Sequence, residues 1–383
     1  MDMELSYVMV TPYTVAKSRT GGVIARLLSR LDLELAGAQI VLPDGKFVAD
    51  YAALLRKQNF PNQLTLLADY VETHFISGGR PHRVLLLLFR GQEACRKLSD
   101  ICGALHAENR GIESLTGETI RDTYADLIVD PLNNEQVTYF EPAVLTPRNQ
   151  KDALEDLALI GAFLEGKENI AANMDYPSPS KIEKTLVILK PDNWNYASSR
   201  PGTIIDMFSR TGMRIVGIKV HQFSLEEALE FYGPVEEALK KKLAPVFGRK
   251  AAEILEKEFQ IELNEKIRNL LTESFGREYA EREFQNIVEF MSGRRSGSGA
   301  GKSVKTMILV YEGEGAIGKI REVLGPTDPL KAPGGTVRRE FGSNVMINTA
   351  HASDSAESFN REKNIVKIGE NGLRDIILEH LGH

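Results

Sequence analysis

The chain of 383 residues has little cysteine, no excess of positive charge and no long apolar run. Its two cysteines, Cys95 and Cys102, are too few for a disulfide scaffold and fit no zinc-binding spacing, so we expect a reducing, cytoplasmic setting and no bound metal. The net charge of −6 argues against nucleic acid as a partner. No stretch is long enough to span a membrane and no signal peptide opens the chain, so no membrane association is expected.

The sequence contains an internal repeat. Residues 4–41, "ELSYVMVTPYTVAKSRTGGVIARLLSRLDLELAGAQIV", match residues 183–220, "EKTLVILKPDNWNYASSRPGTIIDMFSRTGMRIVGIKV". Both copies read strand, proline, polar loop, arginine, glycine, amphipathic helix and second strand. The match resumes between "HRVLLLLFRGQEACRKLSDICG" and "VKTMILVYEGEGAIGKIREVLG", and again where Thr119-Ile-Arg121 sets against Thr336-Val-Arg338. The chain is therefore predicted to contain two copies of one α/β lobe.

The order of elements predicts an α+β fold: two tandem ferredoxin-like (split β-α-β) lobes with antiparallel sheets. We place the first lobe at residues 1–164, a polar linker at 165–182, and the second lobe at 183–383 with a helical insertion at about 235–291. Within the insertion, apolar residues recur at three- and four-residue steps, which is typical of a helix. They are Leu255, Phe259, Leu263, Ile267 and Leu270. Gly276 is predicted to end one helix, and a second is predicted from about Arg277 to Met291.

Two glycine-rich stretches resemble nucleotide-binding motifs. Gly313, Gly315 and Gly318 fit the dinucleotide fingerprint G-x-G-x-x-G after an apolar run. The first copy has Glu93 and Arg96 where the last two glycines stand, which favours a simple strand–turn–helix unit. Residues 296–303, "SGSGAGKS", lack the first glycine of a P-loop and precede a strand instead of following one, so a flexible connector is the better interpretation.

A dense polar cluster follows at residues 324–362, and it includes His351 between two small residues. Taken alone, such a histidine is more often structural or solvated. Arg321 and Arg338 could equally be surface ion-pair partners, and Glu362 could equally be an ordinary acid on a helix surface. Together with Lys190, however, the two arginines supply cations suited to a polyphosphate. Thr327 and Asn348 add neutral hydrogen-bonding groups. An accessible imidazole among such groups can act as a nucleophile.

The second copy resembles the nucleoside diphosphate kinase family. The stretches "TLVILKPD", "GPTDP", "GTVRREFG" and "NTAHASDSAES" are similar to that family's blocks, in order and spacing, over about residues 183–233 and 292–365. The resemblance implies ping-pong transfer of the γ-phosphoryl group from a nucleoside triphosphate to a nucleoside diphosphate through phosphorylated His351. It implies a catalytic set of His351, Glu362 and Lys190.

The same resemblance assigns further roles. Glu362 would hold the other ring nitrogen of His351 and fix its tautomer. Nucleotide-binding roles would fall to Lys190, Tyr232, Arg321, Thr327, Arg338 and Asn348. Mg²⁺ would arrive on the nucleotide phosphates, which needs no carboxylate cage.

Three departures from the family bear on these expectations. The segment from Tyr232 to Ser292 is long, which leaves the base-stacking residue open, with Phe247 as a candidate. Ala352 stands where glycine is usual. In the first copy Thr11 replaces Lys190, and counting from Tyr124 places Asn134 where the histidine belongs; Arg121 alone matches, opposite Arg338.

We therefore predict that the first lobe is a pseudo-active partner, which makes the chain a pseudo-dimer; homo-oligomerisation stays open. Two alternatives to the kinase remain: a nucleotide-binding regulatory module, and a phosphohistidine donor to a protein partner.

Overall fold

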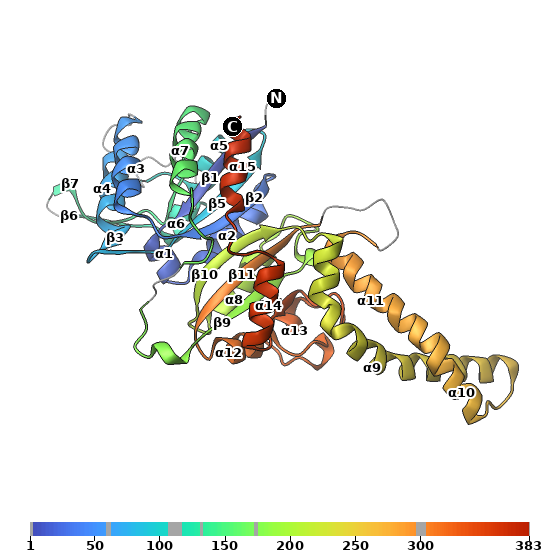
Figure 1. The fold of residues 1–383 in the computed structure, drawn as a ribbon. Helices are drawn as coiled ribbons and strands as arrows, with labels where there is room; N and C mark the ends of the chain where they lie inside the picture. Colours follow the sequence, from blue (N-terminus) through green and yellow to red (C-terminus); the bar gives the residue numbers. More distant parts are fainter. Residues whose placement is uncertain are drawn as a thin grey trace. The chain divides into compact units, whose positions relative to one another are not determined.

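The computed structural model describes residues 3–58, 63–105, 117–130, 133–171, 175–295 and 304–382. Helices and antiparallel sheets are mixed throughout this part of the chain (Figure 1). This confirms the predicted α+β class. The P-loop-like run at 296–303 lies outside the described residues.

The first four-stranded sheet has the strand order β2-β5-β1-β8. Its strands are β1 (Glu4–Val10), β2 (Glu34–Val41), β5 (Val84–Gly91) and β8 (Val144–Leu145). β1 and β5 are antiparallel, with Tyr7 opposite Leu88. Nearly every residue of these two central strands is buried, which explains why their sequences read as continuous apolar runs without alternation.

The second four-stranded sheet has the order β10-β11-β9-β12. Its strands are β9 (Ile182–Leu189), β10 (Arg214–His221), β11 (Thr306–Glu314) and β12 (Ala350–Ala352). β9 and β11 are antiparallel, with Val187 opposite Leu309. Each strand takes the place of its repeat counterpart: β9 that of β1, β10 that of β2, β11 that of β5 and β12 that of β8. The two sheets therefore share one strand order.

The remaining elements cover and connect these sheets. In the first half they are α1 (Pro12–Ala16), α2 (Thr20–Arg30), α3 (Gly45–Lys57), α4 (Gln63–His74), α5 (Ala94–Cys102), α6 (Ile120–Tyr124) and α7 (Gln150–Phe163), with two hairpins, β3 (Ile76–Ser77) with β4 (Arg80–Pro81) and β6 (Asp126–Asp130) with β7 (Asn133–Glu141). In the second half they are α8 (Arg200–Ser209), α12 (Ala316–Leu324), α13 (Val337–Phe341), α14 (Ala356–Ile365) and α15 (Gly372–Leu381), with 3-10 turns at Pro179–Lys181, Pro191–Asn193 and Pro329–Lys331.

The C-terminal helix α15 joins the core of the first sheet. Leu373 and Ile377 are buried in the same apolar cluster as Leu5, Tyr7 and Leu88. Figure 1 shows α15 beside α7 and β2. Helix α15 therefore contributes to the same hydrophobic core as strands β1 and β5.

The glycine-rich turn at the end of β11 has a conformational role. Gly315 begins α12 in the left-handed region at φ +64°, and Glu93 begins α5 in the first half at φ +53°. A Cβ at Gly318 would meet nothing within 4 Å. The turn therefore forms without glycines at these positions, which confirms the strand–turn–helix interpretation over the dinucleotide fingerprint.

By compactness, the described chain divides into two units. One consists of 1–220, 307–363 and 367–383, and holds both sheets; the other consists of 221–306 and 364–366. This division cuts across the lobes predicted from the repeat, whose boundaries remain a prediction. None of the helices in the described residues is long and apolar enough to cross a membrane.

The second unit is built from helices α9 (Leu225–Phe259), α10 (Glu265–Leu271) and α11 (Arg277–Ser292), with a π-helical turn at Thr272–Gly276. Ser224 begins α9 with a capping box that includes Glu227. The π-helical turn ends at Gly276 and α11 begins at Arg277, which confirms the predicted second helix from about Arg277 to Met291. Gly276 itself has ordinary helical angles, so it does not break the helix there. The reason is packing: a Cβ on Gly276 would lie 2.2 Å from the Ala244 carbonyl oxygen, so the glycine permits close contact with α9.

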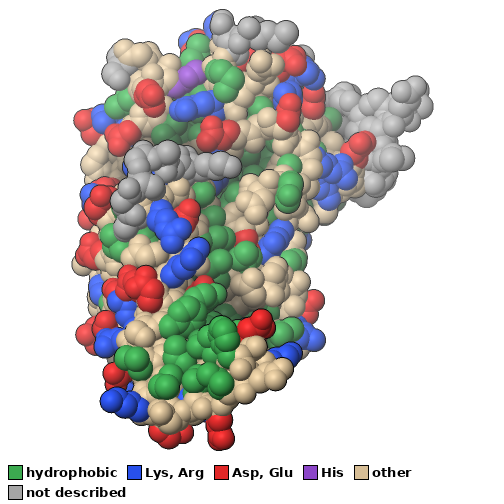
Figure 2. Space-filling view, turned by 90° about the vertical axis from the view of Figure 1, so that its right-hand side faces the viewer, with side chains coloured by type: hydrophobic (Ala, Val, Ile, Leu, Met, Phe, Trp, Pro, Cys, Tyr) green, Lys and Arg blue, Asp and Glu red, His purple; other side chains and the backbone are tan. Residues whose placement is uncertain are grey.

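Much of the apolar stripe in this helical unit faces solvent. Phe259 is 65% exposed and Leu270 is 61% exposed, because the chain reverses after Gln260 in the left-handed region and does not continue as one helix. Leu263 is buried. Figure 2 shows hydrophobic side chains gathered over part of the face that it draws. The periodicity thus predicted the helices correctly but not which side of them is covered.

Within the first unit, α2 and α8 approach to backbone contact. A Cβ on Gly202 would lie 2.2 Å from the Gly21 carbonyl oxygen and 2.3 Å from the Ala25 nitrogen. Both neighbours are backbone atoms and cannot rotate away. Gly202 is therefore required by the contact between the first and second halves of the repeat.

We expect Gly202→Ala to lower the free energy of unfolding by about 1–3 kcal/mol, because one added methyl forces the two helices apart. Urea denaturation of the full chain measures this. Gly318→Ala, in α12, is the matched control: its new methyl meets open space, and alanine is the better helix former by about 0.5–1 kcal/mol. Equal destabilisation by both variants would contradict the close contact.

Candidate active site

His351 is held by a buried carboxylate. Its Nε2 lies 3.0 Å from Glu362 Oε1, and Ser353 donates a 2.6 Å hydrogen bond to the second oxygen, Oε2. The imidazole side chain is 24% exposed while that of Glu362 is 4% exposed. Because both carboxylate oxygens are engaged, Glu362 is fixed in position. A carboxylate that accepts from Nε2–H leaves Nδ1 as the unprotonated nitrogen of a neutral imidazole.

The backbone that presents His351 is held on both sides. β12 pairs with β9, so that His351 lies opposite Ile188. The preceding residue, Thr349, is fully buried at φ +75°, which is a strained conformation for a β-branched residue. Asn193 Nδ2 donates to the Thr349 carbonyl oxygen at 2.7 Å, and Arg200 donates to its hydroxyl at 2.5 Å.

Lys190, directly after β9, is buried beside this strand. Its Nζ donates to Asn348 Oδ1 at 2.7 Å, and its backbone N–H donates to the Thr349 carbonyl oxygen. Burial, and next the positive charge of Arg338, lower the pKa of Lys190 to about 7; Asp192 opposes this shift. The lysine therefore lies in an environment that favours an added negative charge.

The other predicted polar residues surround the same segment. Arg338 donates to the Gly325 and Ala350 carbonyl oxygens, each at 3.0 Å, and Arg321 donates to the Ala352 carbonyl oxygen at 3.4 Å. Asn348 Nδ2 donates to the backbone carbonyl of Thr327 at 3.2 Å. The Thr327 side chain is exposed. The structure thus brings Lys190, Arg321, Thr327, Arg338, Asn348, His351 and Glu362 into one connected region.

Two residues considered from sequence belong to the other compact unit. Tyr232 lies on α9, and its ring is 5.1 Å from that of Phe231. Phe247 packs on Tyr279 at 4.1 Å between ring centroids. The role of Tyr232 in nucleotide binding, and that of Phe247 in base stacking, remain predictions.

Sequence reasoning missed the residues that support the site. Ser353, two positions after His351, clamps Glu362. The Arg200 guanidinium donates hydrogen bonds to Asp192 Oδ2 at 2.6 Å, to the Phe341 carbonyl oxygen and to the Thr349 hydroxyl. A signal for Arg200 was available, because the repeat preserves it: Arg19 in the first half donates to the Tyr124 carbonyl oxygen.

The matching position in the first sheet is Leu145, which corrects the expected counterpart. Leu145 lies opposite Met9 on β1, as His351 lies opposite Ile188 on β9. Asn134 is instead on β7. Counting failed because the β6–β7 hairpin lies between Tyr124 and β8. The position thus carries an apolar side chain with no nucleophile.

A buried carboxylate lies where the first half would need a cation. Thr11, the counterpart of Lys190, donates to Glu141 Oε1 at 2.6 Å, and Tyr70 donates to Oε2 at 2.5 Å. Glu141 is 1% exposed. An acidic group in this place disfavours a phosphate.

Arg121 is retained in the first half for a structural reason. It donates to the Gly103 and Val144 carbonyl oxygens, which correspond to the Gly325 and Ala350 oxygens that Arg338 contacts. In both halves the guanidinium ties the short edge strand to the turn after a helix. An arginine here is therefore needed whether or not a phosphate binds.

The fold and the site together define an α+β protein with a carboxylate-held histidine among cationic groups. The family model for nucleoside diphosphate kinase matches residues 235–367. Over 176 residues the chain is 31% identical to the nucleoside diphosphate kinase of Anaeromyxobacter sp. (strain Fw109-5), covering 46% of this chain and 83% of that protein. It is also 31% identical to that of Bdellovibrio bacteriovorus over 181 residues, covering 47% and 89%.

Two solved structures are also similar. The nucleoside diphosphate kinase of Aquifex aeolicus is 28% identical with a TM-score of 0.33, covering 50% of this chain and 98% of that one. An NDP kinase from Pyrobaculum aerophilum is 30% identical with a TM-score of 0.34, covering 48% and 94%. These sequence relatives show that the chain belongs to the nucleoside diphosphate kinase family. This confirms the resemblance that the motifs of the second repeat copy indicated.

The burial of Lys190 predicts a pH dependence of stability. Between about pH 7 and pH 10.5 the unfolded chain holds a proton at this lysine that the folded chain has lost, so the free energy of unfolding rises with pH there, by up to about 1.4 kcal/mol per pH unit. Lys190→Met should lack this contribution. Denaturant titrations across this range, read as the difference between variant and wild type, measure it. Lys46→Met, at an exposed lysine, is the control, and a Lys190→Met profile parallel to wild type would refute the shift.

Proposed function

We propose that the chain is a nucleoside diphosphate kinase with one working site, centred on His351. The observation that carries this proposal is the hydrogen bond between His351 and the buried, doubly engaged Glu362, with Lys190 and Arg338 nearby. A histidine held in one tautomer among cations is suited to accept a phosphoryl group. The named relatives support the same activity.

In the first half-reaction, His351 Nδ1 attacks the γ-phosphorus of a nucleoside triphosphate. The nitrogen–phosphorus bond forms as the bond from this phosphorus to the β,γ-bridging oxygen breaks, and the nucleoside diphosphate leaves with the electron pair. The proton on Nε2 stays in the hydrogen bond with Glu362. That carboxylate offsets the positive charge that develops on the ring.

The cations bind the phosphates and stabilise the charge of the transition state. Arg338 lies close enough to Lys190 that its positive charge, together with burial, lowers the pKa of the lysine. A phosphate bound between the two cations would supply a negative charge that stabilises both. Arg321 and Thr327 are exposed at the edge of the same region. Asn348 positions the Lys190 amine and would contact the ribose. Magnesium enters as part of the nucleotide substrate and screens its phosphates.

In the second half-reaction, a terminal phosphate oxygen of a nucleoside diphosphate attacks the phosphohistidine. The nitrogen–phosphorus bond breaks and the imidazole regains its lone pair. The two half-reactions are chemically symmetric, so the same active-site residues serve both. Thr349, held in a strained conformation by Asn193 and Arg200, keeps the ring in place throughout.

The first half of the chain is proposed to be a tandem, non-catalytic copy of the same lobe. The shared strand order supports this, as do Leu145 at the histidine position and Glu141 at the cation position. In this proposal it supplies a partner surface within the chain, through the contact of α2 with α8. The regulatory-module and protein-donor alternatives gain no specific observation.

The primary test is incubation of the chain with γ-labelled ATP and Mg²⁺, followed by a chase with unlabelled GDP. We expect an acid-labile label that moves to GDP and is absent in His351→Ala. A label on His351 that passes to no diphosphate would identify a protein acceptor instead. The absence of any label on wild type would refute phosphotransfer.

Glu362→Gln tests the role of the carboxylate. Since it weakens a charge-assisted hydrogen bond but keeps the side-chain shape, we expect kcat/KM to fall about tenfold or more. Glu322→Gln, at an exposed acid on α12, is the matched control and should behave like wild type. Stopped-flow measurement of the first half-reaction separates this effect from nucleotide release. An unchanged rate of phosphohistidine formation in Glu362→Gln would contradict the proposed role.

The pseudo-dimer predicts that the chain sediments as a single copy, because the contact that a second subunit would otherwise make is supplied by the first half. Sedimentation velocity at micromolar concentration measures this. A hexamer would count against it.

A further inference from the structure

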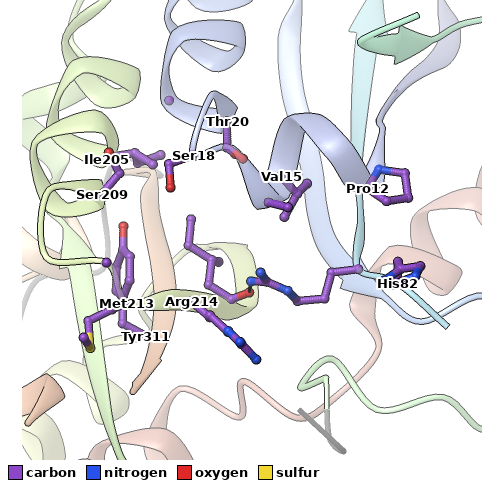
Figure 3. Close-up of a pocket in the computed structure, with 15 residues that line it drawn as sticks. Pro12, Val15, Ser18, Thr20, His82, Ile205, Ser209, Met213, Arg214 and Tyr311 are labelled. Atoms are coloured by element: carbon purple, nitrogen blue, oxygen red, sulfur yellow. Dashed lines mark hydrogen bonds between the residues drawn. The ribbon is translucent and has the colours of Figure 1, made fainter. Parts of the chain in front are cut away.

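We propose that the cavity between the two halves of the repeat, distinct from the His351 site, binds a small organic anion with an apolar body and a phosphate or carboxylate head. The cavity has a volume of about 380 Å³, within the range of small-molecule sites. It is drawn in Figure 3. None of the residues that line it belongs to the candidate active site.

The wall of the cavity comes from both halves of the repeat. The first half contributes α1, the start of α2, and the residues that follow β4; the second half contributes α8, the start of β10, and β11. Arg83 bridges the two, since its guanidinium donates to the Ile215 carbonyl oxygen. A ligand here would therefore contact both halves at once.

The charge of the lining is positive. Arg83, Arg214 and His82 line the cavity, and no aspartate or glutamate is among its described lining residues. Arg214 stacks over Tyr176 at 4.5 Å. Burial, and then the neighbouring Arg214, lower the pKa of Arg83 to about 10. The Arg83 guanidinium faces the cavity, and Arg214, which also donates to the Asp175 carbonyl oxygen, adds a second positive charge beside it. This charge, without a lining carboxylate, favours an anion.

The acids in the neighbourhood are engaged elsewhere. Glu312 lies 3.1 Å from Lys184 Nζ and accepts a hydrogen bond from Tyr176 at 2.9 Å. Asp206 meets the backbone N–H of Gly22 at the beginning of α2. Neither acid lines the cavity. Their charges still reach the lining: Glu312 opposes the lowering of the Arg83 pKa, and burial and then Asp206 raise the pKa of Tyr311. The lining itself carries arginines and no carboxylate.

An unpartnered hydroxyl provides independent evidence for a ligand. Tyr311 is 1% exposed, and its hydroxyl has no hydrogen-bond partner among the described residues. In Figure 3 this hydroxyl points toward the side of the cavity lined by Ser18, Ile205 and Ser209. A buried hydroxyl without a partner is unfavourable, and an acceptor oxygen on a ligand would satisfy it.

The rest of the lining determines the ligand class. Pro12, Val15, Ile205 and Met213 form an apolar part of the wall, and Val15 and Ile205 are buried. A bare inorganic ion would leave this part without contact. The cavity therefore suits an anionic head that contacts Arg83 and offers an acceptor oxygen to the Tyr311 hydroxyl, with a compact apolar or aromatic body beside Pro12 and Val15.

The test is isothermal titration calorimetry of the full chain with phenyl phosphate, benzoate and neutral phenol. We expect phenyl phosphate or benzoate to bind at one site per chain, and whichever binds more tightly identifies the head group. Arg83→Gln should weaken binding by about tenfold or more, the loss of one charge-assisted hydrogen bond. Ala16→Trp, which fills the mouth from an exposed position, should abolish it.

Control variants separate this cavity from the active site and from misfolding. Tyr311→Phe removes a single oxygen atom and should weaken binding even if Arg83→Gln fails to fold. Arg96→Gln, at an exposed arginine on α5, should leave binding unchanged, as should Lys190→Met in the candidate active site. The proposal is overturned if neither anion binds at millimolar concentration, if phenol binds equally well, or if Lys190→Met abolishes binding while the cavity variants do not.

Discussion

The pairing of the three-residue strand β12 with β9 is the interaction on which the site depends. It places His351 opposite Ile188 and leaves Thr349 in a left-handed conformation immediately before the strand. So short a strand cannot hold its register by backbone hydrogen bonds alone. Side-chain hydrogen bonds fix the register: Arg338 donates to the Ala350 carbonyl oxygen, Asn193 donates to the Thr349 carbonyl oxygen, and Ser353 Oγ accepts from the Leu186 backbone N–H on β9. The pairing of β12 with β9 therefore determines the position of the imidazole.

The first half repeats the frame of the site without its histidine and its lysine. Arg121 makes the two backbone contacts that Arg338 makes, and Ala143 repeats the left-handed angle of Thr349. The histidine position is Leu145, and Thr11, at the position of Lys190, donates to the buried Glu141, as does Tyr70. The arginine that holds the edge strand is thus present in both halves, whereas Leu145 and Thr11 stand at the positions of His351 and Lys190. Comparison of the two halves therefore distinguishes a residue that holds the fold, the arginine, from residues proposed to take part in the reaction, the histidine and the lysine.

The helical unit is stabilised by close helix–helix contacts and ion pairs as well as by buried apolar side chains. Its helices approach closely at Gly276 and Gly248, where a Cβ would meet backbone atoms of Ala244 and Thr272. Lys240 forms ion pairs with Glu236 and Glu281, which raise the pKa of this lysine. These close contacts and ion pairs add to the buried apolar side chains Phe284 and Val288, while other large apolar side chains such as Phe259 and Leu270 remain exposed. Hydrophobic periodicity alone therefore indicates helix in this segment but does not identify its covered face.

The sequence by itself determined the repeat, the α+β class and the helices of the insertion, because these follow from local periodicity and from motifs of fixed spacing. It placed His351, Glu362 and Lys190 in one group through their resemblance to a family, and the structure connects them. Only the tertiary structure decided that Leu145, and not Asn134, occupies the equivalent position, since strand pairing and not residue counting sets equivalence across an inserted hairpin. It alone identified Ser353 and Arg200 as supports and Gly276 as a packing residue, because those roles depend on contacts between segments far apart in the chain.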